Sequence, residues 1–241
     1  MMVMDSVSRK AAITVRGLVK RYHFQPVLDD LSLSLSDGDF CVLVGANGAG
    51  KTTLLRILAD LARPNQGEVL INGLPLKASP ALRQAIGYIS HQPMFYEDLT
   101  ALENLEHYAR LYGLSQPAER ISACLRASGL ASYQNQPVRT YSRGMQQRLS
   151  IERALLHDPK ILLFDEPYTG LDQEAAQRLD RRLQALHTPG RVILVAAHRP
   201  QRLIPVASHI AWLQSGRISH HIPASQLNSS PELLAYLQEV P

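Results

Sequence analysis

The chain has 241 residues, of which 45% are hydrophobic and 19% charged, a composition typical of a globular protein and not of a disordered one. Its net charge is +4, but the basic residues are spread out without the dense run of a nucleic-acid tail, so we expect no nucleic-acid partner. Cys41 and Cys124 match no metal or redox spacing. Residues 1–10 lack the apolar core of a secretion signal, and no apolar run approaches the about 20 residues that span a bilayer, so we expect any membrane role to come through a partner.

The first predicted elements are β-strands in residues 13–36, where apolar and polar residues alternate. Leu28 is out of phase with the three leucines that follow it. This break in the alternation predicts a bulge or turn at residues 29–30.

A phosphate-binding loop follows the next strand. The apolar run at residues 40–44 predicts a buried strand, residues 45–52 match G-x-x-x-x-G-K-[ST] at every fixed position, and a helix is predicted at residues 53–61. In such loops backbone N–H groups turn toward phosphate oxygens at the positive end of a helix. The Lys51 ammonium would bind the β- and γ-phosphates, and the Thr52 hydroxyl can bind Mg²⁺. The loop residues predicted to bind the nucleotide are Gly45, Asn47, Gly48, Ala49, Gly50, Lys51, Thr52 and Thr53.

A helical block interrupts the alternation of strands and helices in the middle of the chain. It follows strands predicted at residues 67–73, closed by an Asn-Gly turn, and at 85–90. Helical periodicity then runs over residues 101–132, with a second helix near 118–128. The block at about 93–140 is therefore predicted to be an inserted helical subdomain. The apolar residues expected to share one face of its first helix are Leu102, Leu105, Tyr108, Ala109 and Leu111.

Continuous apolar strands return at residues 161–165 and 192–197, with a helix predicted between them at 173–186. Strands of this kind are buried on both faces, which indicates a mainly parallel sheet flanked by helices. We therefore predict an α/β fold of the P-loop NTPase class. It would have a mainly parallel central sheet, an N-terminal antiparallel β subdomain and the inserted helical subdomain, all in one domain spanning residues 1–241.

The C-terminal part of the chain carries weaker patterns. Two short strands are predicted around residues 210–213 and 216–220. A last helix is predicted after Ser230, a cap residue, with Pro231 in its first turn.

Two carboxylates end the strand at residues 161–165. Asp165 emerges where open α/β sheets bind ligands, and a carboxylate there can hold Mg²⁺. Glu166, one residue further on, could orient and polarise an attacking water as a general base. An acidic strand end is a weak signal alone, but with the phosphate loop upstream it predicts the second half of a nucleotide site.

Residues 141–150 read Tyr-Ser-Arg-Gly-Met-Gln-Gln-Arg-Leu-Ser and resemble the signature motif of ATP-binding-cassette (ABC) proteins, whose usual form is L-S-G-G-Q. Other residues extend the resemblance over nearly the whole chain. Tyr22 matches the aromatic residue that stacks on adenine, and His198 matches the histidine that contacts the γ-phosphate. Residues 167–172 resemble the loop that crosses the dimer interface.

The resemblance implies an ATP hydrolase that works as a dimer with a second, identical or related ATP-binding subunit. Each ATP would lie between the phosphate loop of one subunit and Ser142 and Gly144 of the other, with Asp172 of the interface loop among the nucleotide-binding residues. The helical block at 93–140 would contact an integral-membrane permease. The chain would then be peripheral, at the cytoplasmic face of the inner or plasma membrane.

The sequence departs from the family pattern at two places. The glutamine expected after the strand at 85–90 is replaced by His91, with Gln92 next, and the sequence leaves open which of the two fills the catalytic coupling role. Arg143 and Met145 replace a glycine and the glutamine of the usual signature. The arginine could lie near the partner's phosphates or face solvent, and the methionine is expected to pack.

Several motifs resemble the ATPase subunit of haem exporters used in cytochrome c maturation, which is the subtype we predict, although drug and polysaccharide exporters share some of them. One alternative is a soluble cassette ATPase for cofactor assembly, such as iron–sulfur delivery, without a membrane partner. A non-hydrolysing switch is disfavoured by the presence of Glu166 and His198. The motifs that resemble the haem exporters lie at residues 90–93, 99–105, 141–145 and 165–172.

Overall fold

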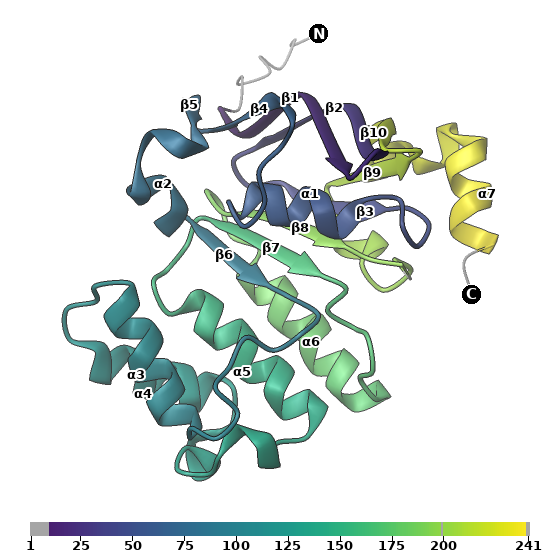
Figure 1. The fold of residues 1–241 in the computed structure, drawn as a ribbon. Coiled ribbons are helices and arrows are strands. Elements are labelled where there is room, and N and C mark those ends of the chain that lie inside the picture. The colour runs from purple at the N-terminus through teal and green to yellow at the C-terminus, as the bar shows by residue number, and fades with distance from the viewer. Residues whose placement is uncertain (1–9, 199, 240–241) are drawn as a thin grey trace, which may run out of the picture.

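A computed structural model of the chain describes residues 10–198 and 200–239. The segment interpreted above as lacking a secretion signal, residues 1–10, lies outside this range except for Lys10. The fold has two sheets, one mainly parallel and one antiparallel, with a group of helices extending away from the larger sheet (Figure 1). This is the predicted architecture of a mainly parallel sheet, an antiparallel β subdomain and a helical subdomain.

The larger sheet has six strands in the order β10-β9-β3-β8-β7-β6, and only β10 runs antiparallel to its neighbour. Each residue of β3, β7 and β8 is buried, as expected for strands that are covered on both faces. The six strands are β3 (Phe40–Val44), β6 (Ile86–Ile89), β7 (Ile161–Asp165), β8 (Val192–Ala196), β9 (His209–Gln214) and β10 (Arg217–Pro223).

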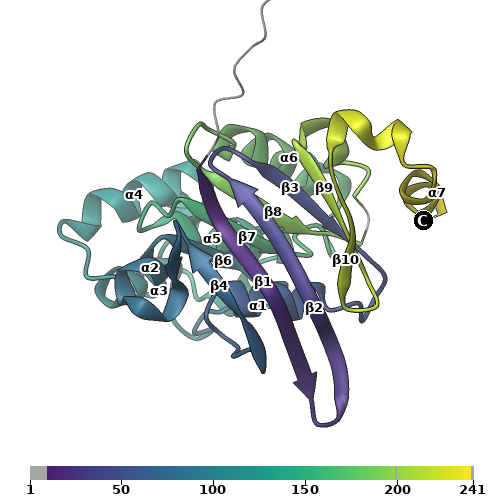
Figure 2. The ribbon, with the colours of Figure 1, turned by 90° about the horizontal axis from the view of Figure 1, so that it is seen from above.

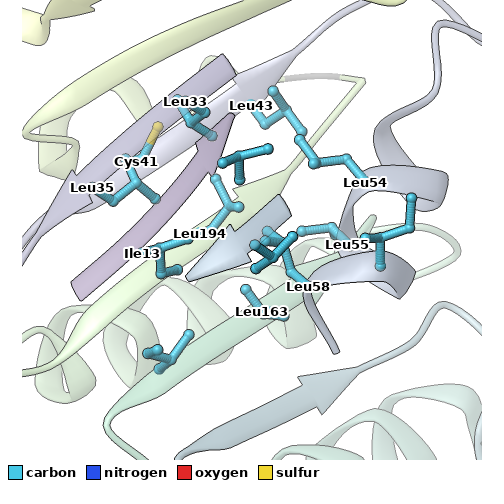
Figure 3. Packing of buried hydrophobic residues seen from close by; sticks show 14 of the residues in the cluster. Ile13, Leu33, Leu35, Cys41, Leu43, Leu54, Leu55, Leu58, Leu163 and Leu194 are labelled. Atoms are coloured by element: carbon cyan, nitrogen blue, oxygen red, sulfur yellow. The ribbon is translucent and has the colours of Figure 1, made fainter. Parts of the chain in front are cut away.

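Alternate residues of these strands enter two separate cores, because successive side chains of a strand point to opposite faces. On one face Leu43, Leu163 and Leu194 pack with α1 (Lys51–Leu58) and with the antiparallel sheet (Figure 3). On the other face Phe40 and Phe164 pack with α5 (Arg143–Leu155) and α6 (Gln173–Leu186). The predicted range of α6 is confirmed in full. In contrast, α1 begins two residues earlier and ends three residues earlier than the predicted helix at 53–61.

The antiparallel sheet has the order β2-β1-β4-β5, and its long β1–β2 hairpin crosses the larger sheet (Figure 2). The predicted bulge is confirmed: Leu18 pairs with Leu31 but Lys20 pairs with Leu28, which leaves one extra residue on β2. The predicted Asn-Gly turn is also confirmed, with positive φ at Asn72. The four strands are β1 (Ala11–Tyr22), β2 (Gln25–Ser36), β4 (Gln66–Ile71) and β5 (Leu74–Pro75).

The helical region packs as a third core on the outer part of α5. Leu105 and Ala109 are fully buried there, together with Leu149 of α5. Leu111 is 65% exposed, so its predicted place on the buried face is wrong. Two residues beyond Ala109 is about 200° around a helix, which turns Leu111 away from the core.

The remaining helices are short, and none found within residues 10–198 and 200–239 is long and apolar enough to cross a membrane. They are α2 (Pro80–Gln84), α3 (Ala101–Leu111), α4 (Pro117–Ala127) and α7 (Pro231–Glu239). Short 3-10 helices lie at Leu76–Ala78, Ala131–Tyr133, Val138–Thr140, Ile204–Val206 and Ala224–Ser229.

Candidate functional site

The phosphate loop, residues 45–50, connects β3 to α1 and requires glycine at both of its ends. A Cβ on Gly45 would lie 2.5 Å from the carbonyl oxygen of Leu213, and one on Gly50 would lie 2.7 Å from Leu28 Cδ2. Gly50 also has a φ of +108°, which a residue with a side chain rarely adopts. The loop therefore keeps its path only with glycine at these positions.

Lys51 is folded back over the loop and is only 6% exposed. Its Nζ donates to the carbonyl oxygens of Gly45 at 2.7 Å and Ala46 at 3.2 Å, and lies 3.5 Å from Glu166 Oε1. A buried ammonium needs such acceptors, because an unpaired buried charge is strongly unfavourable. The lysine thus lies between the loop and the acidic end of β7.

Thr52 and Asp165 meet although they are 113 residues apart in the chain. The Thr52 hydroxyl donates to Asp165 Oδ1 at 2.9 Å, and the carboxylate is fully buried. Tyr88, at the end of β6, donates its hydroxyl to Asp165 Oδ2 at 3.2 Å. Burial, and then the nearby Asp165, raise the pKa of Tyr88 to about 12, so the hydroxyl stays a donor at neutral pH.

Tyr88 was missed by the sequence analysis. The usable signal was its position, since a tyrosine next to last in a strand that neighbours β7 can reach the carboxylate at the end of β7. That signal depends on the strand order, which the sequence does not state.

Glu166 directs its carboxylate between Lys51 and the turn at His198. Its φ is +50°, an uncommon value for a residue with a side chain, and its N–H donates to Ala196 O at 2.9 Å. Its Oε2 accepts from the backbone N–H of His198 at 2.9 Å. The His198 imidazole has a buried Nδ1 without a hydrogen-bond partner in the described part of the chain. The strained backbone of Glu166 is the kind of feature found where a side chain must point in a functional direction.

The structure brings His91 to the site and leaves Gln92 outside it. His91 Nδ1 lies 3.5 Å from Asp165 Oδ2, and the side chain is 46% exposed. Gln92 is exposed, and its backbone N–H donates to Ser90 Oγ. Among the described residues its side chain makes no hydrogen bond, so the geometry favours His91 as the positional equivalent of the family's glutamine.

A cavity of about 390 Å³ opens over the phosphate loop. Tyr22 forms one wall; it is 44% exposed, with Lys20 Nζ 4.8 Å from its ring centroid. Val27 lines the cavity although the sequence did not predict it. Gly45 and Ala49, which were predicted to bind the nucleotide, belong to the loop but are not among the lining residues. The residues that line the cavity are Tyr22, Val27, Asn47, Gly48, Gly50, Lys51, Thr52, Thr53 and Glu166.

The signature residues form a helix N-terminus away from this cavity. Ser142 caps α5, and its Oγ accepts from Met145 N–H at 3.3 Å. Gly144 lies in the first turn, where an added Cβ would sit 3.4 Å from Ala175 Cβ on α6. Neither Ser142 nor Gly144 lines the phosphate-loop cavity. Met145 packs against the helical core, as predicted.

The interface-like loop supports the start of the signature helix. A Cβ on Gly170 would lie 2.5 Å from Arg143 Cζ, so the guanidinium packs directly on this glycine. Asp172 caps α6 by accepting from Ala175 N–H at 2.7 Å. The exposed Arg143 therefore covers the loop at Gly170. The contact between Gly144 and Ala175 shows that the N-termini of α5 and α6 lie close together.

The family follows from a match of residues 28–169 to the ABC transporter model, a range that includes the phosphate loop, the signature and the Asp165–Glu166 pair. The chain belongs to the ABC transporter family. This ABC protein is an ATP-binding subunit that hydrolyses ATP.

Three bacterial relatives extend the similarity beyond the matched domain. The ABC ATPase is 36% identical to the ABC transporter ATP-binding protein NatA of Bacillus subtilis over 78% of each chain. It is 36% identical to the Nod factor export ATP-binding protein I of Cupriavidus metallidurans over 86% of this chain and 69% of that one. It is 37% identical to the cytochrome c biogenesis ATP-binding export protein CcmA of Cupriavidus necator, over 70% and 75%.

Solved structures agree with this assignment. An ATP-binding subunit of an ABC transporter superposes with a TM-score of 0.83 at 30% identity, covering 95% of this chain and 100% of that one. A dimeric ATP-binding cassette in a post-hydrolysis state with ADP and Pi superposes with a TM-score of 0.79 at 27% identity, covering 88% and 98%.

Proposed function

We propose that this chain is the ATPase subunit of an exporter for haem or a similar cargo, working at the cytoplasmic face of a membrane beside a separate permease. The observation that carries the proposal is the 37% identity to a cytochrome c biogenesis ATP-binding export protein, together with the motifs at residues 90–93 and 141–145. Relatives for Nod factor export are as similar, so export has broader support than any one cargo.

The helical region is proposed as the part that contacts the permease. Its core is separate from the two cores of the larger sheet, which supports treating residues 93–140 as an insertion into one domain spanning 1–241. A region with its own core can tilt as a body when the nucleotide changes. Such a motion would transmit hydrolysis to the permease.

This chain and a second ATP-binding subunit, an identical copy or a close paralogue, are proposed to bind two ATP molecules head to tail. The cavity over the phosphate loop presents Tyr22 to the base and Lys51 to the phosphates, but its lining includes no signature residue. The Ser142 hydroxyl and the Gly144 N–H lie at the start of α5, where backbone N–H groups and the helix dipole favour an anion. A γ-phosphate bound to one copy would satisfy this helix end of the other copy, so ATP would hold the dimer together.

The residues present fit a Mg²⁺ ion that arrives with ATP. The Thr52 hydroxyl and the Asp165 carboxylate place two oxygen ligands together, and Mg²⁺ prefers oxygen ligands, with the remaining positions taken by phosphate and water. No cluster of three or more His, Cys, Asp or Glu side chains suited to a metal occurs within the described ranges. When bound, the ion would neutralise charge on the β- and γ-phosphates.

Glu166 is proposed as the group that takes the proton from the attacking water. Its Oε2 is held by the His198 N–H and its Oε1 faces Lys51, so the carboxylate is oriented before ATP binds. His198 would contact the γ-phosphate through its imidazole. His91 lies beside Asp165 in the segment that leads into the helical block, so it would link the phosphate and Mg²⁺ site to that block.

The test is to purify the tagged chain in mild detergent from the organism that encodes it and to identify what co-purifies by mass spectrometry. A multi-spanning membrane protein is expected, and its haem content, measured by absorbance, would identify the cargo. Recovery with cytosolic partners only would contradict the exporter and support the cofactor-assembly alternative.

A further inference from the structure

A second cavity, of about 450 Å³, lies where the end of α4, one face of α5 and one face of α6 meet. In Figure 1, α5 and α6 lie side by side below the larger sheet. The cavity shares no lining residue with the one over the phosphate loop. Its volume is within the range of sites that hold small organic molecules.

Positive charge dominates the lining. Among the described residues that line it, Glu152 is the one acidic side chain, and it already pairs with Arg182 at 2.6 Å. The Arg178 charge is paired outside the cavity with Glu174. The other three guanidiniums have no carboxylate partner within residues 10–198 and 200–239. The arginines of the lining are Arg126, Arg148, Arg178, Arg181 and Arg182.

The unsatisfied polar atoms of the lining are all hydrogen-bond donors. Gln147 Nε2 and Arg182 Nε are buried without an acceptor in the described part of the chain. Arg148 donates to two backbone oxygens, those of Ser128, at 2.6 Å, and Gly144. Burial, and next the positive charge of Arg178, lower the pKa of the Arg148 guanidinium. A negatively charged ligand that accepts hydrogen bonds would offset the excess positive charge of the lining.

The cavity also has an apolar side. Ile151 and Leu179 are buried residues of α5 and α6 that line it, and Leu171 lies beside them. An inorganic anion would leave this surface in contact with water. A ligand with an apolar body would cover it and gain roughly 25 cal/mol per Å² of apolar area removed from water.

We propose that this cavity binds a small organic anion, a phosphate monoester or carboxylate on an apolar body, whose charged group faces Arg126, Arg148 and Arg181. The ligand bridges α4, α5 and α6. Because α5 begins at the signature and α6 follows the loop at Gly170, the bound anion stiffens the connection between the helical region and the sheet.

The probes are 1-naphthyl phosphate and 1-naphthoate, with neutral 1-naphthol for comparison, titrated calorimetrically into the full chain. Saturating MgADP fills the phosphate loop, so that the probes cannot bind there. The wild type is expected to bind one or both anions with one-to-one saturation and to bind 1-naphthol at least tenfold more weakly. The headgroup preferred by the protein then distinguishes phosphate from carboxylate.

The variant Arg126→Gln/Arg181→Gln is expected to weaken anion binding at least tenfold, because both side chains are exposed and have no carboxylate partner among the described residues, and their loss removes two charge-assisted contacts. The control Arg63→Gln/Lys77→Gln removes the same charge from another cavity, near Asp60, and should leave binding within twofold. Unchanged binding in the first variant, equal loss in the control, equal binding of 1-naphthol, or no saturable binding of either anion would overturn the proposal.

Discussion

The phosphate loop and the signature differ in how complete they are within one molecule. At the phosphate loop, groups from three elements already touch: Lys51 and Thr52 of α1 contact the two carboxylates at the C-terminal end of β7, and Tyr88 of β6 donates to one of them. At the signature, the Ser142 hydroxyl accepts from the first turn of its own helix, and no other hydrogen bond of this hydroxyl is found among the described residues. The groups at the phosphate loop are therefore already in contact with one another, whereas the signature is an exposed helix N-terminus.

This difference indicates which part of the free energy of ATP binding serves nucleotide binding and which part serves association of subunits. Parallel strands deliver their C-terminal ends to one edge, so the phosphate-loop groups are oriented by the sheet before any ligand arrives. A helix N-terminus on a separate core has no such fixed counterpart. In the proposed head-to-tail arrangement, binding energy at the first region would hold ATP, and binding energy at the second would be available to bring two subunits together.

The largest effect is expected from Glu166→Gln, which keeps the shape of the side chain but removes the base. Turnover should fall by roughly 10²- to 10⁴-fold while ATP still binds, so that an ATP-dependent dimer accumulates. Phosphate release and light scattering measure the two outcomes. Glu174→Gln, at an exposed carboxylate on α6, is the control. Wild-type turnover in Glu166→Gln would remove this residue from the role of base.

Lys51→Ala should abolish the first half-site itself. Two charge-assisted phosphate contacts are lost, so ATP affinity should drop by about 100-fold or more, and the dimer should not form at any accessible ATP concentration. Equilibrium binding of a fluorescent ATP analogue measures this, with Lys160→Ala, an exposed lysine paired with Asp158, as the control. Normal affinity in Lys51→Ala would contradict the phosphate-loop assignment.

Ser142→Ala separates the two regions most directly. ATP affinity of the monomer should stay within twofold, whereas ATP-dependent dimerisation should weaken, and the lost cap should cost about 1 kcal/mol of stability. Ser79→Ala removes a comparable cap, at α2, and should leave dimerisation unchanged. If both serine variants dimerise like the wild type in light scattering, the head-to-tail arrangement is wrong at this position.

Tyr88→Phe tests how much the preformed hydrogen bonds of the first region matter. Loss of the donor to Asp165 should raise the Mg²⁺ concentration needed for half-maximal turnover about fivefold, since a hydrogen bond to a charged group contributes about 1 kcal/mol or somewhat more. Because the pKa of Tyr88 is raised, its hydroxyl should remain a donor between pH 7 and 9, so the difference between wild type and variant should be the same over that interval. Tyr133→Phe, at a partly exposed tyrosine of the helical region, is the control. An unchanged Mg²⁺ requirement would show that Tyr88 does not orient Asp165.

The smallest effect concerns contacts of His157, which link the helical region to strand β6 of the larger sheet. His157, which follows α5, stacks on Tyr112 at 3.9 Å and contacts Ile86 O, and burial lowers its pKa. A histidine with a lowered folded-state pKa contributes its full stability above the unfolded value of about 6.5 and loses it as pH falls toward the folded value. The Tm should therefore drop between pH 7.5 and 5.5.

His157→Gln should show a smaller drop in Tm over the same pH interval. A residual slope is expected, because burial also lowers the pKa of His221. A slope equal to that of the wild type, measured by circular dichroism, would exclude His157 as a contributor to acid sensitivity.

Local patterns in the sequence determined the elements and most residues of the first half-site. The apolar runs at β3 and β7 are readable because only strands buried on both faces lack polar residues. The bulge near Asp30 is readable because it shifts the alternation of apolar residues along the strand. The turn at Asn72 is readable because an Asn-Gly pair accepts positive φ. The phosphate loop is readable because its glycines and lysine are needed at fixed spacing within one turn.

Only the tertiary structure decided which distant segments of the chain contact one another. The strand order places β6 next to β7, which brings Tyr88 and His91 to Asp165 and leaves Gln92 outside. The packing of α5 on α6 sets Arg143 on Gly170 and gathers arginines from three helices around one cavity. These contacts join residues far apart in the chain, and no periodicity or spacing within a segment contains that information.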